Sequence, residues 1–479
     1  MLLIKKFKSS IFFPKNLLIF KEIFFLALPL IFSQLSRVFM GLVDLAMVAG
    51  LGPEALAATA SGGIIIWSVT SVALGIKTSV QTVSSRRLGQ KKMKESGRAF
   101  YNGFLMAVGY SLPLFLVGYF FTSEIVTIYL DHPVSTPMSI EYTEVLFIGL
   151  IFTSMNFVFH GFLTGVEKTR IHLFVAISSN LLNIYLNAGF IYGSGGVVAY
   201  FKTLDPIFFS ASKLWTWFSF PQLGVKGAAI GTVLSSLFSL VQYLVYVFLS
   251  KTRKQFHLFP AGLNHPMLKR QFQLAFPMGV QEFGLAVGWA FYLRIFSLIG
   301  IIEFATIHVI FSIMHASFMP AVGVGQACAT YVGKYLGEKR PQKAEQSIKE
   351  AVRISEYIMG SMGVLFILFP QHIILMFTSD MAIVNMGEMG LRVLGVLQFL
   401  DALGITFWLS LNAAGNTIFP AMVELALLFL WLLPASYFLG VYLEIGFLGP
   451  ILTLPVHFVA FTVILGFKLY NGEWKNIEV

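Results

Sequence analysis

Twelve runs of mostly apolar residues constrain the fold of this chain more than any other feature of its sequence. A helix needs about 20 such residues to cross the hydrocarbon core of a bilayer. The runs are too long for the strands of an outer-membrane barrel. The expected spans are 22–50, 57–83, 99–121, 142–164, 170–192, 224–249, 272–299, 304–332, 352–377, 391–413, 418–441 and 446–469. We therefore predict an all-α polytopic membrane protein.

The composition excludes several other classes of protein. Hydrophobic residues make up 57% of the chain and charged residues 12%, against roughly 45–50% and 25% in soluble domains. A soluble enzyme and a disordered chain are excluded on this ground. The single cysteine, Cys328, excludes structural disulfides and cysteine-based metal clusters. We find no HExxH, Walker A or GxSxG motif, and we expect neither an enzyme nor a bound cofactor.

The positions of the basic residues predict the orientation. With the N-terminus in the cytoplasm, 26 of the 33 Lys and Arg residues fall in cytoplasmic segments. Four fall in outer segments: Lys202, Lys213, Lys226 and Arg392. This bias predicts that both termini are cytoplasmic. It also explains the net charge of +10 without a nucleic-acid partner.

An internal repeat relates the two halves of the chain. At an offset of 248, residues 26–29 match 274–277, Gly75 matches Gly323, and Thr169 matches Thr417. Six helices separate the copies, so both halves have the same orientation in the membrane, which is typical of a parallel repeat. We therefore expect two six-helix lobes with a site between them near the midplane.

The repeat divides the chain into five segments. They are a cytoplasmic tail (1–21), an N-lobe (22–249), a cytoplasmic linker (250–271), a C-lobe (272–469) and a second cytoplasmic tail (470–479). The N-lobe carries an outer insert at about 196–222, which is rich in aromatic residues. This insert is interpreted either as an interfacial aromatic belt or as a lid over the cavity.

Ionisable residues inside the spans are candidate functional groups, because each costs about 3 kcal/mol to insert. Asp44 lies in the outer half of the first span, seven residues after Arg37. The helical rise between them is about 10 Å, too far for a direct ion pair. A carboxyl group in this environment can bind a proton or a cation near neutral pH. The alternative is a structural carboxylate satisfied by Arg37 or by a backbone amide.

Polar residues in other spans extend this candidate site. Asn183 and Asn187 lie on one face of the fifth span; their amides can ligate Na⁺, hold a carboxylate, or join helices. Asp401 and Glu282 are candidates for a C-lobe site. Four other residues are less specific candidates. Arg37 and Arg294 are possible cavity charges, and Glu424 is a weaker candidate. We expect Lys77 to extend part of the way toward the cytoplasm. For His160, His308 and His315 we expect hydrogen-bonded interior positions without metal spacing. Gly161/Gly165 and Gly284/Gly288 are expected to permit close helix packing.

In this order and spacing the sequence resembles the multidrug and toxic compound extrusion (MATE) family, over nearly the whole chain. The motifs that carry the resemblance are 26–29 with 41–44, 52–58, 183–193, 223–232, and Asp401 with 414–417. The resemblance implies a twelve-helix antiporter that exports organic compounds in exchange for H⁺ or Na⁺. It places the cation-coupling site of the N-lobe at Asp44, Asn183, Asn187 and Thr232.

Two positions depart from the family pattern. The NorM-like branch has acids in the seventh and tenth helices, and Asp401 fits the latter. Leu285 stands where the seventh-helix Glu is expected, and Glu282 lies one turn earlier. Either Glu282 substitutes for that Glu, or the C-lobe site is incomplete. Glu167 stands where Gly is usual.

The predicted function is therefore secondary antiport by alternating access. The expected partners are small organic molecules and the bilayer, the protein is expected to be a monomer, and the expected location is the bacterial cytoplasmic membrane. The coupling ion, H⁺ or Na⁺, stays open. Two alternatives are a flippase for lipid-linked precursors and a receptor or scaffold that transports nothing.

Overall fold

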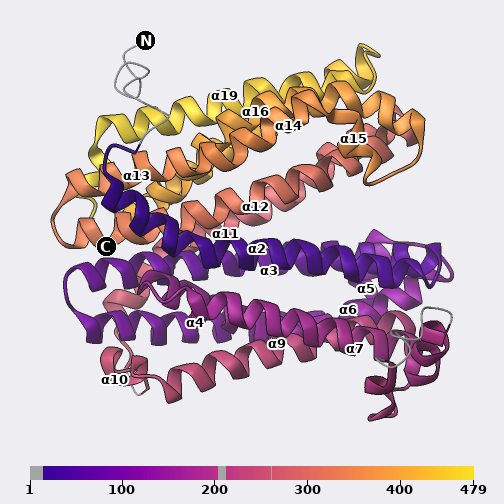
Figure 1. The fold of residues 1–479 in the computed structure, drawn as a ribbon, viewed down its shortest axis with the longest axis horizontal. Helices are drawn as coiled ribbons and strands as arrows, with labels where there is room; N and C mark the ends of the chain where they lie inside the picture. The colour runs from indigo at the N-terminus through magenta and orange to yellow at the C-terminus, as the bar shows by residue number, and fades with distance from the viewer. Residues whose placement is uncertain (1–13, 203–211, 260–261) are drawn as a thin grey trace.

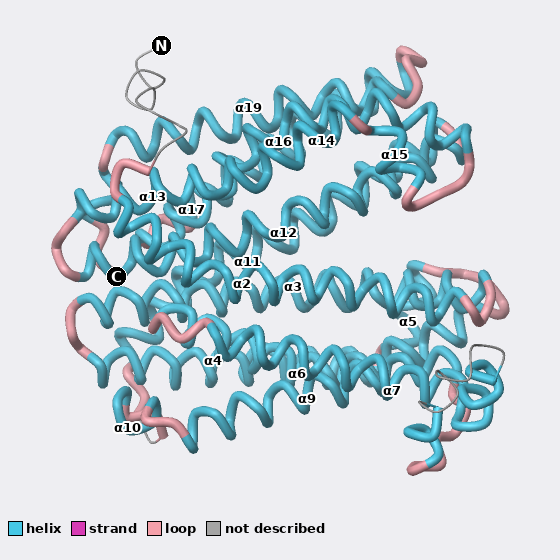
Figure 2. Tube along the Cα trace, in the orientation of Figure 1, coloured by secondary structure: helices cyan, strands magenta, loops and turns pink. Residues whose placement is uncertain are grey.

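The computed structural model describes residues 14–202, 212–259 and 262–479. All regular structure in these ranges is helical (Figure 2). Helices satisfy every backbone hydrogen bond within one segment, which a lipid environment requires. Twelve of the described helices or helix groups are long and apolar enough to cross a membrane, as the sequence predicts. The protein is a multi-pass membrane protein.

The first six spans form the N-lobe. Its helices are α2 (Leu17–Ala49), α3 (Pro53–Gly89), α4 (Met93–Phe120), the short α5 (Thr122–Tyr129), α6 (Ser135–Gly165), α7 (Arg170–Lys202) and α9 (Gly224–Leu249), with a single turn at Lys213–Thr216. A short helix, α10 (Thr252–Phe256), leads to the second half of the chain. The backbone of α7 kinks at Gly193, where φ is 71°, a conformation that favours glycine.

The last six spans form the C-lobe. Its α-helices are α11 (His265–Ile299), α12 (Ile301–Gly337), α13 (Pro341–Ser355), α14 (Ser361–Leu368), α15 (Pro370–Leu375), α16 (Met381–Ala414), α17 (Ile418–Ala426), α18 (Leu433–Tyr437) and α19 (Leu448–Asn471). Wider π-type turns at Glu356–Gly360, Leu427–Leu432 and Phe438–Tyr442 join the pieces of the ninth and eleventh spans.

The repeat is visible in the backbone itself. Helices α3 and α12 both contain 37 residues, and their first residues are 248 positions apart. The side chains of Asn16 and Asn264 cap α2 and α11 in the same way, each accepting a hydrogen bond from the amide three residues later. Lys91 and Lys339 both have left-handed backbones, with φ of 60° and 59°. The parallel repeat predicted from the sequence is confirmed.

The ninth span differs most from its expected position. We expected 352–377, whereas the structure has Pro341–Leu368. The span ends early because Pro370 has no amide hydrogen to donate and disfavours a helical conformation at Phe369. Phe369 has φ −128° and ψ 43°, and Pro370 begins the separate helix α15.

The two lobes meet through α2 and α3 on one side and α11 and α12 on the other. Glycines allow the backbones to approach closely across this interface. A Cβ at Gly75 would lie 2.3 Å from the carbonyl oxygen of Ala275, and one at Gly323 would lie 2.9 Å from the amide nitrogen of Ile31. Since Gly75 and Gly323 are repeat equivalents, the interface has approximate two-fold symmetry.

The interface is confined to one end of the molecule. In the part of the chain that the structure describes, the hydrogen bonds between the lobes lie at the end of the molecule where α2 and α11 begin and where α3 and α12 end. Examples are Gln81 Nε2 to Thr330 Oγ1 (3.0 Å), Tyr335 to Glu22 (2.8 Å) and the Lys334–Glu167 ion pair (2.6 Å). Toward the opposite end the helices of the two lobes diverge (Figure 1).

The outer insert packs on its own lobe in the part that is described. Trp215 is buried, and its indole Nε1 donates to the carbonyl oxygen of Tyr185 on α7 at 2.8 Å. Trp217 and Phe218 are exposed. The Trp215 ring also packs against the ring of Tyr185, with centroids 5.1 Å apart. Both interpretations of the insert, belt or lid, stay predictions. Phe208 and Phe209 lie outside the described residues.

Candidate ion-coupling site

Four polar side chains from three helices of the N-lobe meet at the position predicted from the sequence. Asn187 Nδ2 donates to Asp44 Oδ1 at 2.7 Å and to Asn183 Oδ1 at 3.0 Å. Asn183 Nδ2 lies 3.5 Å from Thr232 Oγ1. Asn183 and Asn187 are buried, while Asp44 and Thr232 are partly exposed. The cluster therefore has a buried amide side and a carboxylate that faces open space.

Close packing of α7 against α9 places the amides. Asn183 and Asn187 are one turn apart on α7, so both point toward α9. Two glycines of α9 make room for them. A Cβ at Gly227 would lie 2.3 Å from the carbonyl oxygen of Phe190, and one at Gly231 would lie 2.0 Å from Asn187 Oδ1. No larger residue fits at these positions without a shift of α7.

Asp44 has no basic partner among the described residues. Within the described ranges no Lys or Arg forms an ion pair with it, Arg37 included. Tyr142 on α6, which the sequence analysis missed, is close enough to interact with the carboxylate electrostatically. A partly buried carboxylate without a basic partner is suited to bind a proton or a small cation.

The amide orientation distinguishes the two roles considered for the asparagines. Asn187 presents its NH₂ group to Asp44, while its Oδ1 has no hydrogen-bond partner among the described residues and lies against Gly231. An NH₂ group stabilises a bare carboxylate, whereas Na⁺ requires oxygen ligands. Na⁺ at this position would need the amide of Asn187 to turn over. The contact stabilises the ionised form of the Asp44 carboxyl group.

A second group of charges lies between the lobes. Lys77 is buried on α3 and interacts electrostatically with Glu282 of α11, across the interface, and with Arg37 of α2. The sequence predicts that Lys77 extends part of the way toward the cytoplasm, and the structure shows its side chain buried in the interior. The exposed Arg37 interacts with His315 of the C-lobe.

The C-lobe candidates share one neighbour, Glu424. Asp401 is buried on α16 and interacts electrostatically with Glu424 of α17, as does Glu282 of α11. Glu424 in turn pairs with His457 of α19 at 3.6 Å. The sequence analysis gave Glu424 little weight and missed His457. A lone histidine in an apolar span was the only available signal, because its partner is 33 residues away.

Three other candidates lie apart from these groups. Arg294 is exposed and bonds Ser297 of its own helix at 3.1 Å. His308 and His315 are exposed, so their predicted interior positions are wrong. His160 is buried and stacks on His172, with ring centroids 4.1 Å apart, as expected for an interior histidine.

The small-residue pairs pack helices within each lobe, as predicted. Gly161 and Gly165 face the Lys77 and Gln81 carbonyls of α3. Gly284 and Gly288 of α11 face leucines of the eleventh span.

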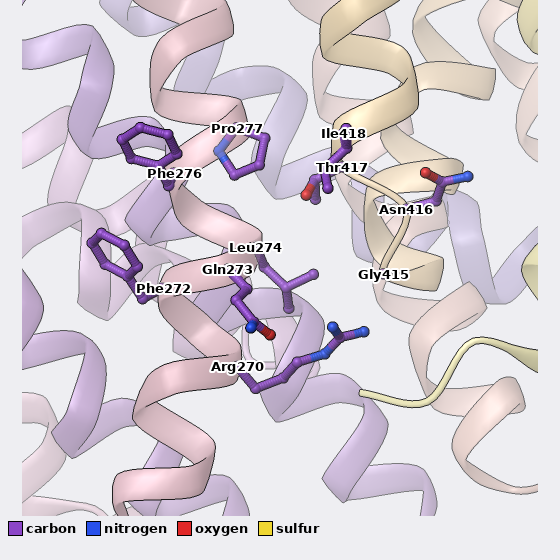
Figure 3. A pocket seen from close by; sticks show the side chains of 10 residues that line it. All are labelled: Arg270, Phe272, Gln273, Leu274, Phe276, Pro277, Gly415, Asn416, Thr417 and Ile418. Carbon is purple, nitrogen blue, oxygen red and sulfur yellow. The ribbon is translucent and has the colours of Figure 1, made fainter.

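A cavity of about 510 Å³ lies apart from both charge groups, between α11 and the turn from α16 to α17 (Figure 3). Its lining includes Arg270, Leu274 and Thr417. The repeat equivalents of the last two, Leu26 and Thr169, are joined by a 3.1 Å hydrogen bond from Thr169 Oγ1. The cavity opens where the described C-lobe lacks this bond, and it contains no predicted site residue.

The described residues contain no group of three or more His, Cys, Asp or Glu side chains arranged to hold a metal ion. Any Na⁺ bound in the N-lobe would therefore depend on one carboxylate together with amide and hydroxyl oxygens.

Comparisons with known proteins agree with this architecture. The MatE family profile matches residues 29–188 and 277–438, once in each lobe. A probable multidrug resistance protein NorM of Thermotoga maritima is 24% identical over 464 residues, which cover 96% of this chain and 94% of that protein. The multidrug resistance protein NorM of Burkholderia vietnamiensis is 22% identical over 79% of this chain and 78% of its own length.

Solved structures show the same fold. A multidrug resistance MATE family transporter of the MOP superfamily, in an outward-facing conformation, has a TM-score of 0.84 at 18% identity, covering 96% of this chain and 97% of that one. A MOP superfamily transporter from Pyrococcus furiosus, reported to have a binding pocket of reverse polarity, has a TM-score of 0.82 at 18% identity, with the same coverage.

Proposed function

Because this chain belongs to the MatE family of membrane transporters, we propose that it exports organic compounds in exchange for H⁺ or Na⁺, by alternating access. The family relatives are transporters and not enzymes. The observation that carries the proposal is the Asp44 carboxylate, held by Asn187 and left without a basic partner.

The lobes contact each other at one end of the molecule, and this arrangement suggests how ion binding is coupled to transport. The lobes touch at the end where both termini are expected to be cytoplasmic, and they diverge at the other end. Asp44 is then reachable from outside, where it takes up the coupling ion. The ion must bind the two conformations with different affinity, because equal affinity shifts no population. One charge moving down 100 mV supplies about 2.3 kcal/mol, enough for roughly a 50-fold gradient.

The location follows from the same proposal. The charge bias of the loops places both termini in the cytoplasm, and the relatives named NorM are bacterial. We propose the bacterial cytoplasmic membrane, a monomer, and amphipathic or cationic organic substrates, for which exposed aromatic side chains such as Phe39 and Trp67 offer surfaces.

The experiment is ethidium efflux from proteoliposomes, with a pH gradient and a Na⁺ gradient imposed separately. The wild type is compared with Asp44→Asn and with Asp131→Asn, which removes an exposed loop carboxylate. We expect gradient-driven efflux in the wild type and in the Asp131 variant, and its loss in the Asp44 variant. Unchanged efflux in Asp44→Asn would remove this carboxylate from the mechanism. Transport of a polyprenyl lipid that survives the substitution would support the flippase alternative.

A further inference from the structure

Glu424 and His457 form an ionisable pair inside the C-lobe. His457 Nε2 lies 3.6 Å from Glu424 Oε1, and the side chains are 3% and 12% exposed. Neither His457 Nδ1 nor Glu424 Oε2 has a hydrogen-bond partner among the described residues. A buried polar atom without a partner costs about 1–3 kcal/mol, so the pair is more than a means of joining α17 to α19.

The charges around this pair are unbalanced. Asp401 of α16 and Glu282 of α11 both interact with Glu424. A positive charge, Lys77 of α3, interacts with Glu282.

Other ionisable groups on these helices have partners elsewhere. Lys468 of α19 pairs with Glu473, Arg392 of α16 with Glu388, and Arg294 of α11 bonds Ser297. Three carboxyl groups thus face one lysine and one histidine in a region from which water is largely excluded.

Burial disfavours the ionised form of these groups. Buried charges require partners, and among the described residues His457 is the group recorded within ion-pairing distance of Glu424. Lys77 can neutralise one of the three carboxyl groups. The His457 ring beside Glu424 is a place where a further proton can be held, on the imidazole or on the carboxyl group.

We propose that Glu424 and His457 form a second proton-binding site, distinct from Asp44, which loads and unloads during the transport cycle. This inference rests on the proposed function of antiport. The site would take a proton, because a carboxyl group and an imidazole within ion-pairing distance can share one.

Packing connects the pair to the lobe interface. A Cβ at Gly284 of α11 would lie 2.4 Å from Leu425, the residue after Glu424, and one at Gly288 would lie 2.2 Å from Leu428. Helix α11 therefore packs directly on the segment that carries Glu424. The same helix contributes Glu282, which interacts with Lys77 across the interface. A proton on Glu424 removes a negative charge near Glu282. The positive charge of Lys77 is then matched by Glu282 alone.

Infrared difference spectroscopy of the protein in lipid nanodiscs, recorded as a function of pH, tests the proposal directly. We expect a protonated-carboxyl band in the wild type that loses one component in Glu424→Gln. In His457→Gln the same component should remain and change its pH dependence, because the neighbouring ionisable group is removed. Matched controls are Glu444→Gln and His308→Gln, whose side chains are exposed. Thermal unfolding verifies that each variant folds.

Spectra in which both site variants keep every wild-type component and midpoint would overturn the proposal, even if Asp44→Asn abolishes efflux. A wild type that shows no gradient-driven export would count against the antiport function. In that case, loss of the component in Glu424→Gln would still demonstrate a proton site, and its persistence would still refute one.

Discussion

Asn187 joins the carboxylate of the N-lobe site to the other amide. Its NH₂ group bonds both Asp44 and Asn183, and its oxygen rests against the Cα of Gly231. The carboxylate is therefore oriented by a residue that is itself held by packing. The site depends on a glycine that carries no polar group and that a list of polar residues would omit.

A methyl group at Gly231 should disable the site without changing any polar residue. In Gly231→Ala, the added Cβ would lie 2.0 Å from Asn187 Oδ1, so the amide must leave its position beside Asp44. We expect ethidium efflux driven by the coupling ion to fall about tenfold or more, which corresponds to roughly 1.4 kcal/mol. Gly63→Ala is the matched control, because a Cβ there meets nothing within 4 Å. Equal efflux in the two variants would contradict this account.

The turns between helices show how the repeat is modified within an element. Glu167, in the turn from α6 to α7, has a left-handed backbone with φ 63°. Its repeat equivalent in the turn from α16 to α17 is Gly415, with φ 96°. A non-glycine residue in this conformation costs about 1–2 kcal/mol. The Glu167 side chain offsets part of this cost by pairing with Lys334 of the other lobe at 2.6 Å.

Two substitutions at Glu167 separate the backbone strain from the ion pair. Glu167→Ala and Glu167→Gly both remove the pair with Lys334, but only glycine relieves the left-handed strain. We expect the glycine variant to be more stable than the alanine variant by about 1 kcal/mol, measured by thermal unfolding in detergent. At Glu338, where φ is −73°, the same two substitutions should show no advantage for glycine. An alanine variant at 167 as stable as the glycine variant would show that the turn is unstrained.

The whole molecule is held in one conformation by polar contacts at a single end. Arg86 of α3 is buried, and its Nη2 donates to the carbonyl oxygens of Ala414 and Ile477 in the C-lobe, each at 3.1 Å. Gly89 and Gly337 bring α3 and α12 together at the same level. The opposite ends of the lobes have no such contacts among the described residues. The ratio of conformations therefore depends on the contacts at this end of the molecule.

Removing the Arg86 contacts should shift the lobes away from this conformation. Hydrogen bonds from a charged group contribute about 1.5–3 kcal/mol each, so Arg86→Gln should change the ratio of conformations at least tenfold. The measurement is the distance between spin labels at Ile128→Cys and Tyr442→Cys, both exposed, after replacement of the buried Cys328 by serine. We expect a new, shorter distance in Arg86→Gln. The control Lys94→Gln removes an exposed charge on α4 and should leave the distribution unchanged; an identical distribution in both variants would contradict the prediction.

The sequence by itself determined the twelve spans, the parallel repeat and the polar residues of the N-lobe site. These features depend on local length, hydropathy and spacing, which are properties of neighbouring residues. Asn183 and Asn187 were predictable as a pair because one helical turn separates them. The family resemblance supplied Asp44 and Thr232 as their partners.

Only the tertiary structure decided which distant side chains meet and which amide atom faces which carboxylate. Glu424 and His457 come together because α17 packs on α19, and Lys77 approaches Glu282 because α3 packs on α11. The ion pair of Glu167 with Lys334 and the one-ended lobe contact likewise depend on how the lobes are docked. Such contacts join residues far apart in the chain, so no local pattern records them. They arise from the way the helices pack. Glycines permit this packing where two helices approach each other closely.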